Sequence, residues 1–179
     1  MAARDRLPPW HERHRLPNGR EVLIRPIRPE DAEPLRAGFA LLEPEPTRAP
    51  LTGGRDMTPT DAERLARPNP RTEFTLVATD LDAPGEALVA ALAYVRTDAA
   101  AHEGDFTLLV SRFVAGMGMR RYLLTRIAKW ARSRGLGVLR GDLPQDADVL
   151  TLADSLGFRR IDGAGDPSLA RVALELPRR

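Results

Sequence analysis

Apolar residues follow two different spacings on either side of a pair of glycines in the middle of the chain. Residues 105–111 alternate as a buried strand does, with their even-numbered apolar residues on one face. Beyond Gly116 and Gly118 the apolar residues recur at helical spacing, which predicts a helix from about residue 118 to residue 134. The residues expected on its buried face are Met119, Leu123, Ile127, Trp130 and Ala131.

The same two patterns divide the rest of the chain into short strands and helices. The turn Pro17-Asn18-Gly19 predicts a hairpin, because Asn-Gly tolerates the positive φ angles of a tight turn. Helix starts are indicated at Pro29 and near Thr58 or Thr60, either of which can act as a cap. The predicted strands are 14–16, 20–27, 73–79, 87–96, 105–111, 138–143, 158–161 and 170–176, the last helix is 148–156, and the loops include 43–54 and 97–104.

This order of elements predicts a single domain of mixed α/β (α+β) class. Strands joined by short turns pair antiparallel, whereas the strands at 105–111 and 138–143 are joined by a helix and are expected to run parallel. With 179 residues, 42% of them hydrophobic, the chain can bury a substantial core. We expect a flexible arm at 1–13, where two prolines oppose regular structure, and one domain at 14–179.

The composition argues against several kinds of site. The chain has no cysteine, which excludes disulfides, thiolate metal sites and a cysteine nucleophile. His11 and His14 are spaced as metal ligands can be, but a site needs more ligands than this stretch supplies, so we expect no metal. A net charge of +2 without a basic, aromatic-rich block indicates no nucleic-acid partner. No apolar run approaches the roughly 18 residues of a membrane span, so we expect a soluble, cytoplasmic protein with no membrane partner.

The strand, glycine loop and helix in the middle of the chain form the sequence pattern of a phosphate-binding cradle. Glycines let the backbone approach an anion, and the first free N–H groups of the helix point at it. Two glycines by themselves are also compatible with an ordinary strand-to-helix turn.

The cradle resembles motif A of the GNAT acetyltransferase superfamily, in which a strand feeds a pyrophosphate-binding loop of the form Gln/Arg-x-x-Gly-x-Gly/Ala. That register falls on residues 115–120, with the central glycine at Gly118 and a frequent extra glycine at Gly116. The chain departs from the pattern at Ala115, where the family has Gln or Arg, and at Arg120, where it has a small residue.

The resemblance extends from about residue 20 to residue 161 and is most similar to one branch of the superfamily. Residues 22–31, 58–65, 87–94 and 156–158 look like the acetyltransferase domain of bacterial protein lysine acetyltransferases, here in a free-standing form. The resemblance implies the GNAT fold. This fold has a central mixed, mostly antiparallel twisted sheet flanked by helices, with a V-shaped splay between the fourth and fifth core strands.

The resemblance also implies acetyl-CoA as co-substrate and residues that would hold it. In the family the thioester carbonyl lies against the backbone of the central strand, here at residues 108–110. Asp146 falls where relatives often have an asparagine that touches the pantetheine arm; the alternative is a plain helix cap. The expected cofactor-binding residues are therefore Leu109, Val110, Ala115, Gly116, Met117, Gly118, Met119, Arg120 and Asp146.

Two carboxylates are candidates for the catalytic base. Relatives carry Ala-Glu-Phe before the apolar strand with the glutamate as base, and this chain has Asp105 at the corresponding position. Glu103 has a longer side chain and is the alternative, and a third interpretation is that Asp105 merely begins the strand. Many family members also have a tyrosine that protonates the departing thiolate, and the matching residue here is Ala153.

These observations predict an acetyl-CoA-dependent N-acetyltransferase that moves an acetyl group directly to a primary amine. The acceptor would be a small molecule or a protein, with a protein lysine favoured by the resemblance, bound between the loops at 43–54 and 97–104. The alternative is a catalytically impaired GNAT module that binds acyl-CoA as a sensor or partner subunit. A homodimer is compatible with either function.

Overall fold

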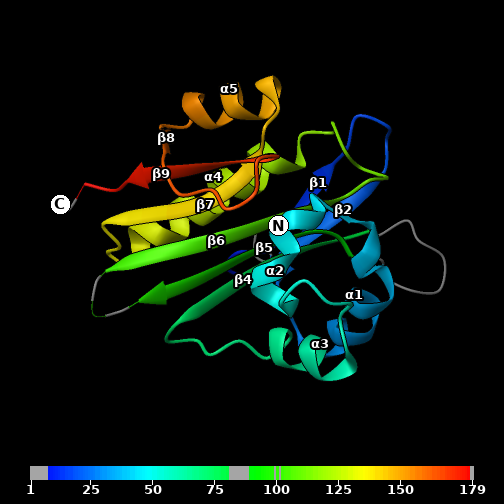
Figure 1. The fold of residues 1–179 in the computed structure, drawn as a ribbon. Helices are drawn as coiled ribbons and strands as arrows, with labels where there is room; N and C mark the ends of the chain where they lie inside the picture. The colour runs from blue at the N-terminus through cyan, green and yellow to red at the C-terminus, as the bar shows by residue number, and fades with distance from the viewer. Residues whose placement is uncertain (1–7, 81–88, 99, 101, 178–179) are drawn as a thin grey trace, which may run out of the picture.

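The computed structural model describes residues 8–80, 89–98, 100 and 102–177. Within these residues nine strands form one sheet, in the order β1-β2-β4-β5-β6-β7-β9-β8, and β3 pairs with β6 (Figure 1). The strands are β1 (Glu12–Arg15), β2 (Glu21–Pro26), β3 (Leu42–Glu43), β4 (Glu73–Asp80), β5 (Val89–Asp98), β6 (Glu103–Ser111), β7 (Val138–Pro144), β8 (Arg159–Ile161) and β9 (Leu169–Glu175).

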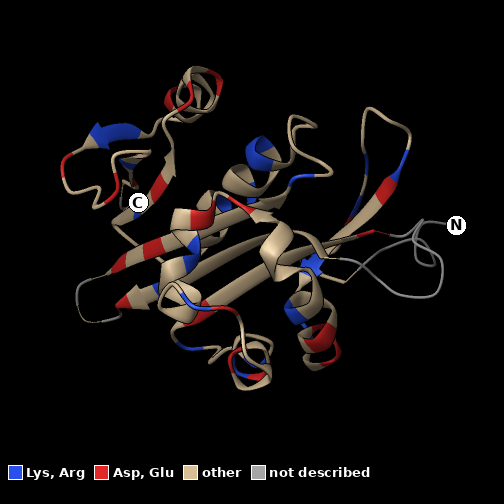
Figure 2. Cartoon of the chain, turned by 45° about the vertical axis from the view of Figure 1, so that its right-hand side comes forward, with Lys and Arg blue, Asp and Glu red and all other residues tan. Residues whose placement is uncertain are grey.

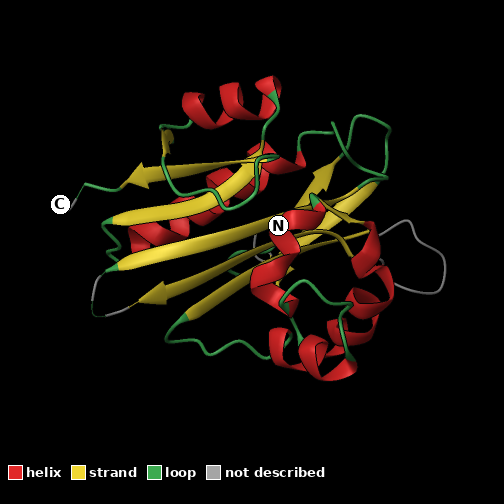
Figure 3. Cartoon of the chain, in the orientation of Figure 1, coloured by secondary structure: helices red, strands yellow, loops and turns green. Residues whose placement is uncertain are grey.

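Helices cover both faces of the sheet, as the colouring in Figure 3 shows. The helix α4 (Met119–Ser133) lies on one face, and α1 (Ala32–Gly38), α2 (Ala49–Thr52) and α3 (Pro59–Leu65) gather on the other. The remaining helical segments are α5 (Ala147–Ser155) and the 3-10 turns η1 (Pro29–Asp31), η2 (Phe39–Leu41) and η3 (Glu45–Arg48).

Two hydrophobic clusters fill the spaces between the sheet and its helices. Phe106, Leu108 and Val110 of β6 pack with α4, whose predicted buried residues Met119, Leu123, Ile127, Trp130 and Ala131 are all buried. Leu109 of the same strand points to the other cluster, with Leu35 and Phe39. Strand β6 is therefore buried on both faces, which explains why its sequence reads as a nearly continuous apolar run.

The N-terminal hairpin forms as predicted, with Gly19 at a φ of 87° in the turn. Its first strand begins at Glu12, two residues before the boundary expected between arm and domain. Ahead of it, the Trp10 ring lies edge-on to Phe74, with ring centroids 5.4 Å apart, so the described end of the arm contacts the sheet.

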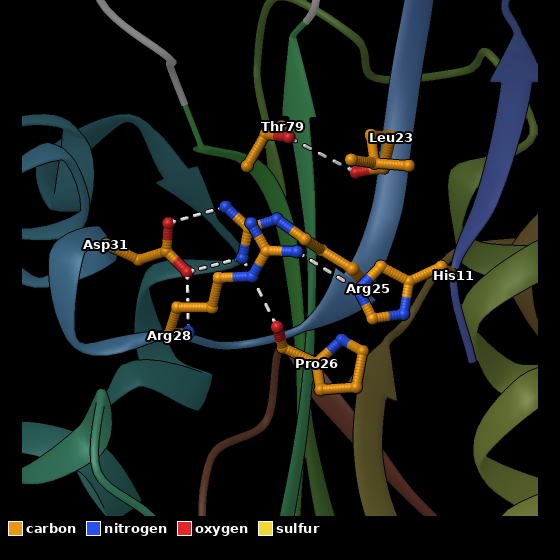
Figure 4. Close-up of polar contacts among 7 residues, drawn as sticks. All are labelled: His11, Leu23, Arg25, Pro26, Arg28, Asp31 and Thr79. Atoms are coloured by element: carbon orange, nitrogen blue, oxygen red, sulfur yellow. Dashed lines mark hydrogen bonds and ion pairs between the residues drawn. The ribbon is translucent and has the colours of Figure 1, made fainter. Parts of the chain in front are cut away.

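A buried ion pair fixes the turn between β2 and α1 (Figure 4). Arg25 donates two hydrogen bonds of 2.7 Å to the carboxylate of Asp31, and both side chains are less than 10% exposed. The backbone N–H of Arg28 donates to the same carboxylate at 2.7 Å. Pro29 follows at the first helical position, where a missing N–H has no cost. The carboxylate thus connects the last residues of the strand to the start of the helix.

The two segments predicted as loops are more ordered than expected. Residues 43–54 contain η3 and the one-turn helix α2, because prolines at 46 and 50 are compatible with the first turn of a helix. The segment 97–104 is largely sheet, since β5 continues to Asp98 and β6 begins at Glu103. The prediction failed there because both strand ends are polar, so no apolar alternation marks them.

Strands β6 and β7 run parallel, as predicted for strands joined by a helix. Their pairing ends at Phe106 and Gly141, although both strands continue. A Cβ atom at Gly141 would lie 2.5 Å from the Phe106 ring, so the absence of a side chain lets these strands pair closely here. Beyond this point the two strands separate, as expected for the splay between the fourth and fifth core strands.

Candidate active site

The edge of β6 that faces β7 changes partner along its length. β7 pairs with this edge as far as Phe106, and β3 pairs with it at Val110 and Ser111. Over residues 107–109, β6 keeps β5 on one side and has no strand on the other among the described residues. The splay therefore leaves a gap three residues long in the hydrogen-bonding edge of a buried strand.

Leu108 is the residue of this gap whose backbone faces the open edge. The Arg112 amide donates to the Leu41 carbonyl at 3.0 Å, and hydrogen-bonded pairs in an antiparallel ladder recur at every second residue. The backbone of Val110 therefore faces β3, that of Leu109 faces β5, and that of Leu108 faces the gap. A ligand that contains amide groups can hydrogen-bond to Leu108 as a neighbouring strand would.

The loop that follows β6 leads into the N-terminus of α4. Gly116 and Gly118 have φ angles of 77° and 84°, in the left-handed region that L residues rarely adopt. A Cβ atom added at either glycine would meet nothing within 4 Å, so the space beside the loop is open. Met119 and Met117 pack toward the core, whereas Ala115 is exposed.

The N-terminus of α4 is suited to an anion. No side chain caps it in the described structure, and its first turn contains no acidic residue. Its first backbone N–H groups are therefore free, and the helix dipole adds partial positive charge at this end. The glycine loop and the helix start that the sequence predicted are therefore both present, and the helix start has free N–H donors.

Arg120 extends from the first turn of α4 toward β3 and α5. Its Nη2 group lies 3.5 Å from the Glu43 carbonyl oxygen, and its Nε group has no hydrogen-bond partner among the described residues. Burial lowers the pKa of Arg120, and the nearby carboxylates of Asp146 and Glu43 oppose this effect. The guanidinium is thus held close to the splay by weak contacts, and its Nε–H remains available to donate a hydrogen bond.

Asp146 acts as the N-cap of α5. Its Oδ1 atom accepts hydrogen bonds from the Asp148 and Val149 amides at 2.9 and 3.1 Å. These contacts correspond to the plain helix cap considered from the sequence. The charge of Asp146 still reaches Arg120, so the residue also contributes to the electrostatics of the splay.

The two candidate bases lie on the sheet face that carries α1–α3, and each is ion-paired. Glu103 accepts two hydrogen bonds from Arg140, at 2.9 and 3.2 Å, and this contact lowers the pKa of Glu103. Asp105 pairs with Arg171 at 3.0 Å while its side chain stays 64% exposed. Arg171 also contacts Asp142 of β7 at 3.3 Å, so it joins the two aspartates. These charged residues belong to β6, β7 and β9, which are neighbours in the sheet. Figure 2 colours the acidic and basic positions along the strands.

A cleft of about 260 Å³ opens where β6 and β7 separate. Asp142 lines it, but Asp105 and Glu103 do not. An adjoining hollow of about 290 Å³ shares Asp166 with it. The other residues that line the cleft are Pro46, Thr47, Ala49, Pro50, Phe106, Thr107, Gly165 and Leu169.

The cleft brings together segments that are distant in the sequence. Residues 46–50 fall in the segment expected to bind an acceptor, whereas none of the lining residues comes from 97–104. Sequence reasoning missed Thr107, Asp142 and Asp166. The only signal for Asp142 was its place in a strand predicted to run parallel to β6, and nothing in the sequence indicated that the turn before β9 reaches this cleft.

The described residues contain no group of three or more His, Cys, Asp or Glu side chains placed to hold a metal ion. None of the described helices has the length and apolar character needed to cross a membrane.

No protein-family model and no curated protein sequence matches this chain. Among solved structures, the GNAT domain of S. lividans PAT has a TM-score of 0.71 and 20% identity, covering 96% of this chain and 100% of that domain. A GCN5-related N-acetyltransferase from Kribbella flavida gives a TM-score of 0.65 and 22% identity, covering 87% and 98%. A GNAT-family acetyltransferase from Streptococcus pneumoniae has a TM-score of 0.66 and 17% identity, and the match covers 87% of this chain and 99% of that protein.

At these identities the comparisons establish the arrangement of the backbone. That arrangement includes the parallel pair β6–β7, its separation beyond Gly141, and the uncapped helix that follows the glycine loop. The chain therefore has the fold of the GNAT acetyltransferases.

Proposed function

We propose that this protein is an acetyl-CoA-dependent N-acetyltransferase that transfers the acetyl group directly to a primary amine. The observation that supports this most strongly is the gap in β6 beside Leu108, on the strand that is followed by the glycine loop and the uncapped N-terminus of α4. Acetyl-CoA has complementary groups in the same order: a thioester and two amides on an extended arm, then a pyrophosphate. The known structures with this fold include several acetyltransferases, which supports the same chemistry.

In this proposal the backbone holds most of the co-substrate. The pyrophosphate accepts hydrogen bonds from the free N–H groups at the start of α4, and a pantetheine amide pairs with the backbone of Leu108 at the open edge of β6. Arg120 lies close enough to the loop to add a charge-assisted contact to a phosphate. The thioester then reaches the cleft beside Phe106 and Thr107, where a backbone donor can stabilise the oxyanion.

The reaction needs an amine that has lost its proton. The amine nitrogen attacks the thioester carbon, the carbon–sulfur bond breaks, and the thiolate leaves with both bonding electrons. We propose Asp105 as the group that accepts the amine's proton, because it is the more exposed candidate on the strand that borders the gap. Ala153 is buried, so this position offers no acid, and the thiolate leaves without help, as its low proton affinity permits.

A protein lysine is the acceptor that the sequence resemblance favours. The solved GNAT domain of S. lividans PAT, which this chain covers completely, supports the same branch of the fold. A lysine side chain also fits a cleft that is narrow and partly apolar.

A pH–rate profile tests the assignment of the base. We expect Asp105→Ala to slow transfer from acetyl-CoA to a lysine peptide about 10²- to 10⁴-fold, the usual contribution of a general base. The loss should shrink as pH rises, because more of the amine is already neutral. Glu103→Gln is the matched control and should have a mild effect, since Arg140 already occupies that carboxylate. Equal rates for wild type and Asp105→Ala between about pH 6 and pH 9 would remove Asp105 from the mechanism.

The second candidate is a module that binds acyl-CoA without catalysis. The position of Arg120 favours it, because the family has a small residue there and the guanidinium lies close to the splay. The ion pair between Asp105 and Arg171 favours it too, since Arg171 already occupies one oxygen of the carboxylate that would accept the proton. Clear acetyl-CoA binding without turnover of any amine would support this function, whereas turnover would exclude it.

A further inference from the structure

Asp142 occupies a distinctive position in β7. It is the first residue beyond Gly141, where the pairing with β6 ends. Its side chain lies on the same face as Asp105 and lines the cleft together with Thr107 and Phe106. Asp142 is therefore the carboxylate that borders the point where the two strands separate.

The charged side chains that line the cleft are acidic, and the cation that compensates one of them lies outside the lining. Among the described lining residues the charged ones are Asp142 and Asp166, and both are acidic. Asp166 accepts hydrogen bonds from the backbone and hydroxyl of Ser168, which lowers the pKa of Asp166 and keeps it ionised. Arg171 approaches Asp142 from outside the lining, at 3.3 Å, and it shares its other amino group with Asp105.

This arrangement leaves part of the Asp142 carboxylate available. Its side chain is 30% exposed, and a carboxylate has about four sites that can accept a hydrogen bond. Because Arg171 is also held by Asp105, it stays in place when Asp142 takes a second cation. An ammonium group that enters the cleft would thus meet a carboxylate that Arg171 already holds in position.

The apolar part of the lining restricts what can carry that ammonium. Pro46, Pro50, Phe106 and Leu169 line this cleft of about 260 Å³. This volume lies just below the range of about 300–1,000 Å³ for small-molecule sites, which favours a slender ligand over a bulky or branched amine. The surfaces suit an unbranched chain of methylene groups, whose burial is favourable.

We propose that Asp142 binds the ammonium group of the acceptor, and that the acceptor is a primary amine on an unbranched alkyl chain. This inference rests on the proposed transferase function and deepens it. Asp142 sets the affinity for the acceptor, while the proton is removed by a different group once the amine is in place. Asp166 adds to the negative potential at the mouth of the cleft.

Steady-state kinetics with Nα-acetyl-lysine methylamide as acceptor tests the proposal. At pH 7 this amine is almost entirely protonated, since lysine has a pKa near 10.4. We expect Asp142→Asn to raise its KM about 10- to 100-fold, the value of a hydrogen bond to a charged group. The kcat should change little, because the lost contact holds the substrate rather than the transition state. The acetyl-CoA-induced thermal shift should stay at its wild-type size.

Asp154→Asn is the matched control. Asp154 is exposed on α5 and does not line the cleft, so this variant removes the same charge without touching the acceptor. A KM for Asp142→Asn equal to that of Asp154→Asn would overturn the proposal. A reduced kcat with an unchanged KM would overturn it as well, because it would make Asp142 part of the chemistry instead.

Failure of the transferase function can be distinguished from failure of this inference. If the wild type binds acetyl-CoA but acetylates no amine, the proposed function is wrong. NMR titrations with n-butylammonium in the presence of CoA then test whether Asp142 binds an ammonium group. Saturable shifts at Thr107 and Gly141 that are lost in Asp142→Asn would support it, and their absence from the wild type would overturn it.

Discussion

Replacement of Gly141 by alanine tests how closely β6 and β7 must approach before they separate. The added Cβ atom would lie 2.5 Å from two atoms of the Phe106 ring and 2.6 Å from a third, whereas ordinary contacts begin near 3.4 Å. Phe106 is 4% exposed and packs edge-on against Phe158, with ring centroids 5.8 Å apart, so the ring cannot move away freely. Overpacking of this kind costs about 1–3 kcal/mol, and we expect about 2 kcal/mol here.

Thermal and urea unfolding measure this cost. For a chain of this length each kcal/mol lowers the Tm by about 2–4 °C, so Gly141→Ala should melt about 4–8 °C below wild type. Gly137→Ala is the matched control, because a Cβ atom there would meet only the His102 carbonyl oxygen, at 3.7 Å. A Tm for Gly141→Ala equal to that of Gly137→Ala would show that the strands do not need this close approach.

A second substitution identifies the clash itself. Phe106→Leu shortens the side chain that the new methyl group meets. The double variant Phe106→Leu/Gly141→Ala should lose less free energy of unfolding than the two single variants lose together, because the larger ring is no longer there to clash. Strict additivity would assign the destabilisation of Gly141→Ala to backbone effects rather than to contact with Phe106.

Three further outcomes are expected. Gly118→Val should abolish the acetyl-CoA-induced rise in Tm while the protein still folds, because the side chain would enter the open cradle; an undiminished rise would place the phosphates elsewhere. Arg120→Ala should weaken acetyl-CoA binding about tenfold, more at low salt than at high salt, while the exposed Arg121→Ala should not; tighter binding would mean that Arg120 obstructs the splay. Asp31→Asn should lower the free energy of unfolding by about 3–5 kcal/mol because it leaves a buried guanidinium unpaired, whereas Glu33→Gln, which removes a solvent-exposed ion pair, should change the urea midpoint little; equal urea midpoints for the two variants would contradict this.

The sequence by itself determined the elements whose pattern is periodic and the turns whose chemistry is local. The helix at α4 and the strand at β6 follow from the spacing of apolar residues, and the hairpin turn follows from Asn18-Gly19. The parallel pairing of β6 and β7 could also be predicted, because a helix must cross between parallel neighbours. These features depend on interactions between residues close in the chain or on chain connectivity, and both can be read in one dimension.

The glycine loop and the uncapped helix start proposed to bind phosphate were predictable for the same reason. Its glycines and the helix they precede are consecutive, so their joint geometry is local. The gap beside Leu108 was not predictable, because it depends on where β7 leaves β6 and where β3 joins it. Strand β3 has two residues and no sequence signal of its own, so only its contact with β6 reveals it.

Tertiary structure also decided which charged residues meet. Asp105, Asp142 and Arg171 lie on three strands, and their side chains meet only because the sheet places these strands in neighbouring positions. The cleft combines a wall from residues 46–50 with a turn more than a hundred residues later. The sequence shows that a residue carries a charge. Whether a carboxylate serves as a base, an ion-pair partner or a binding group depends on its neighbours in space, and the packing of the whole sheet sets those neighbours.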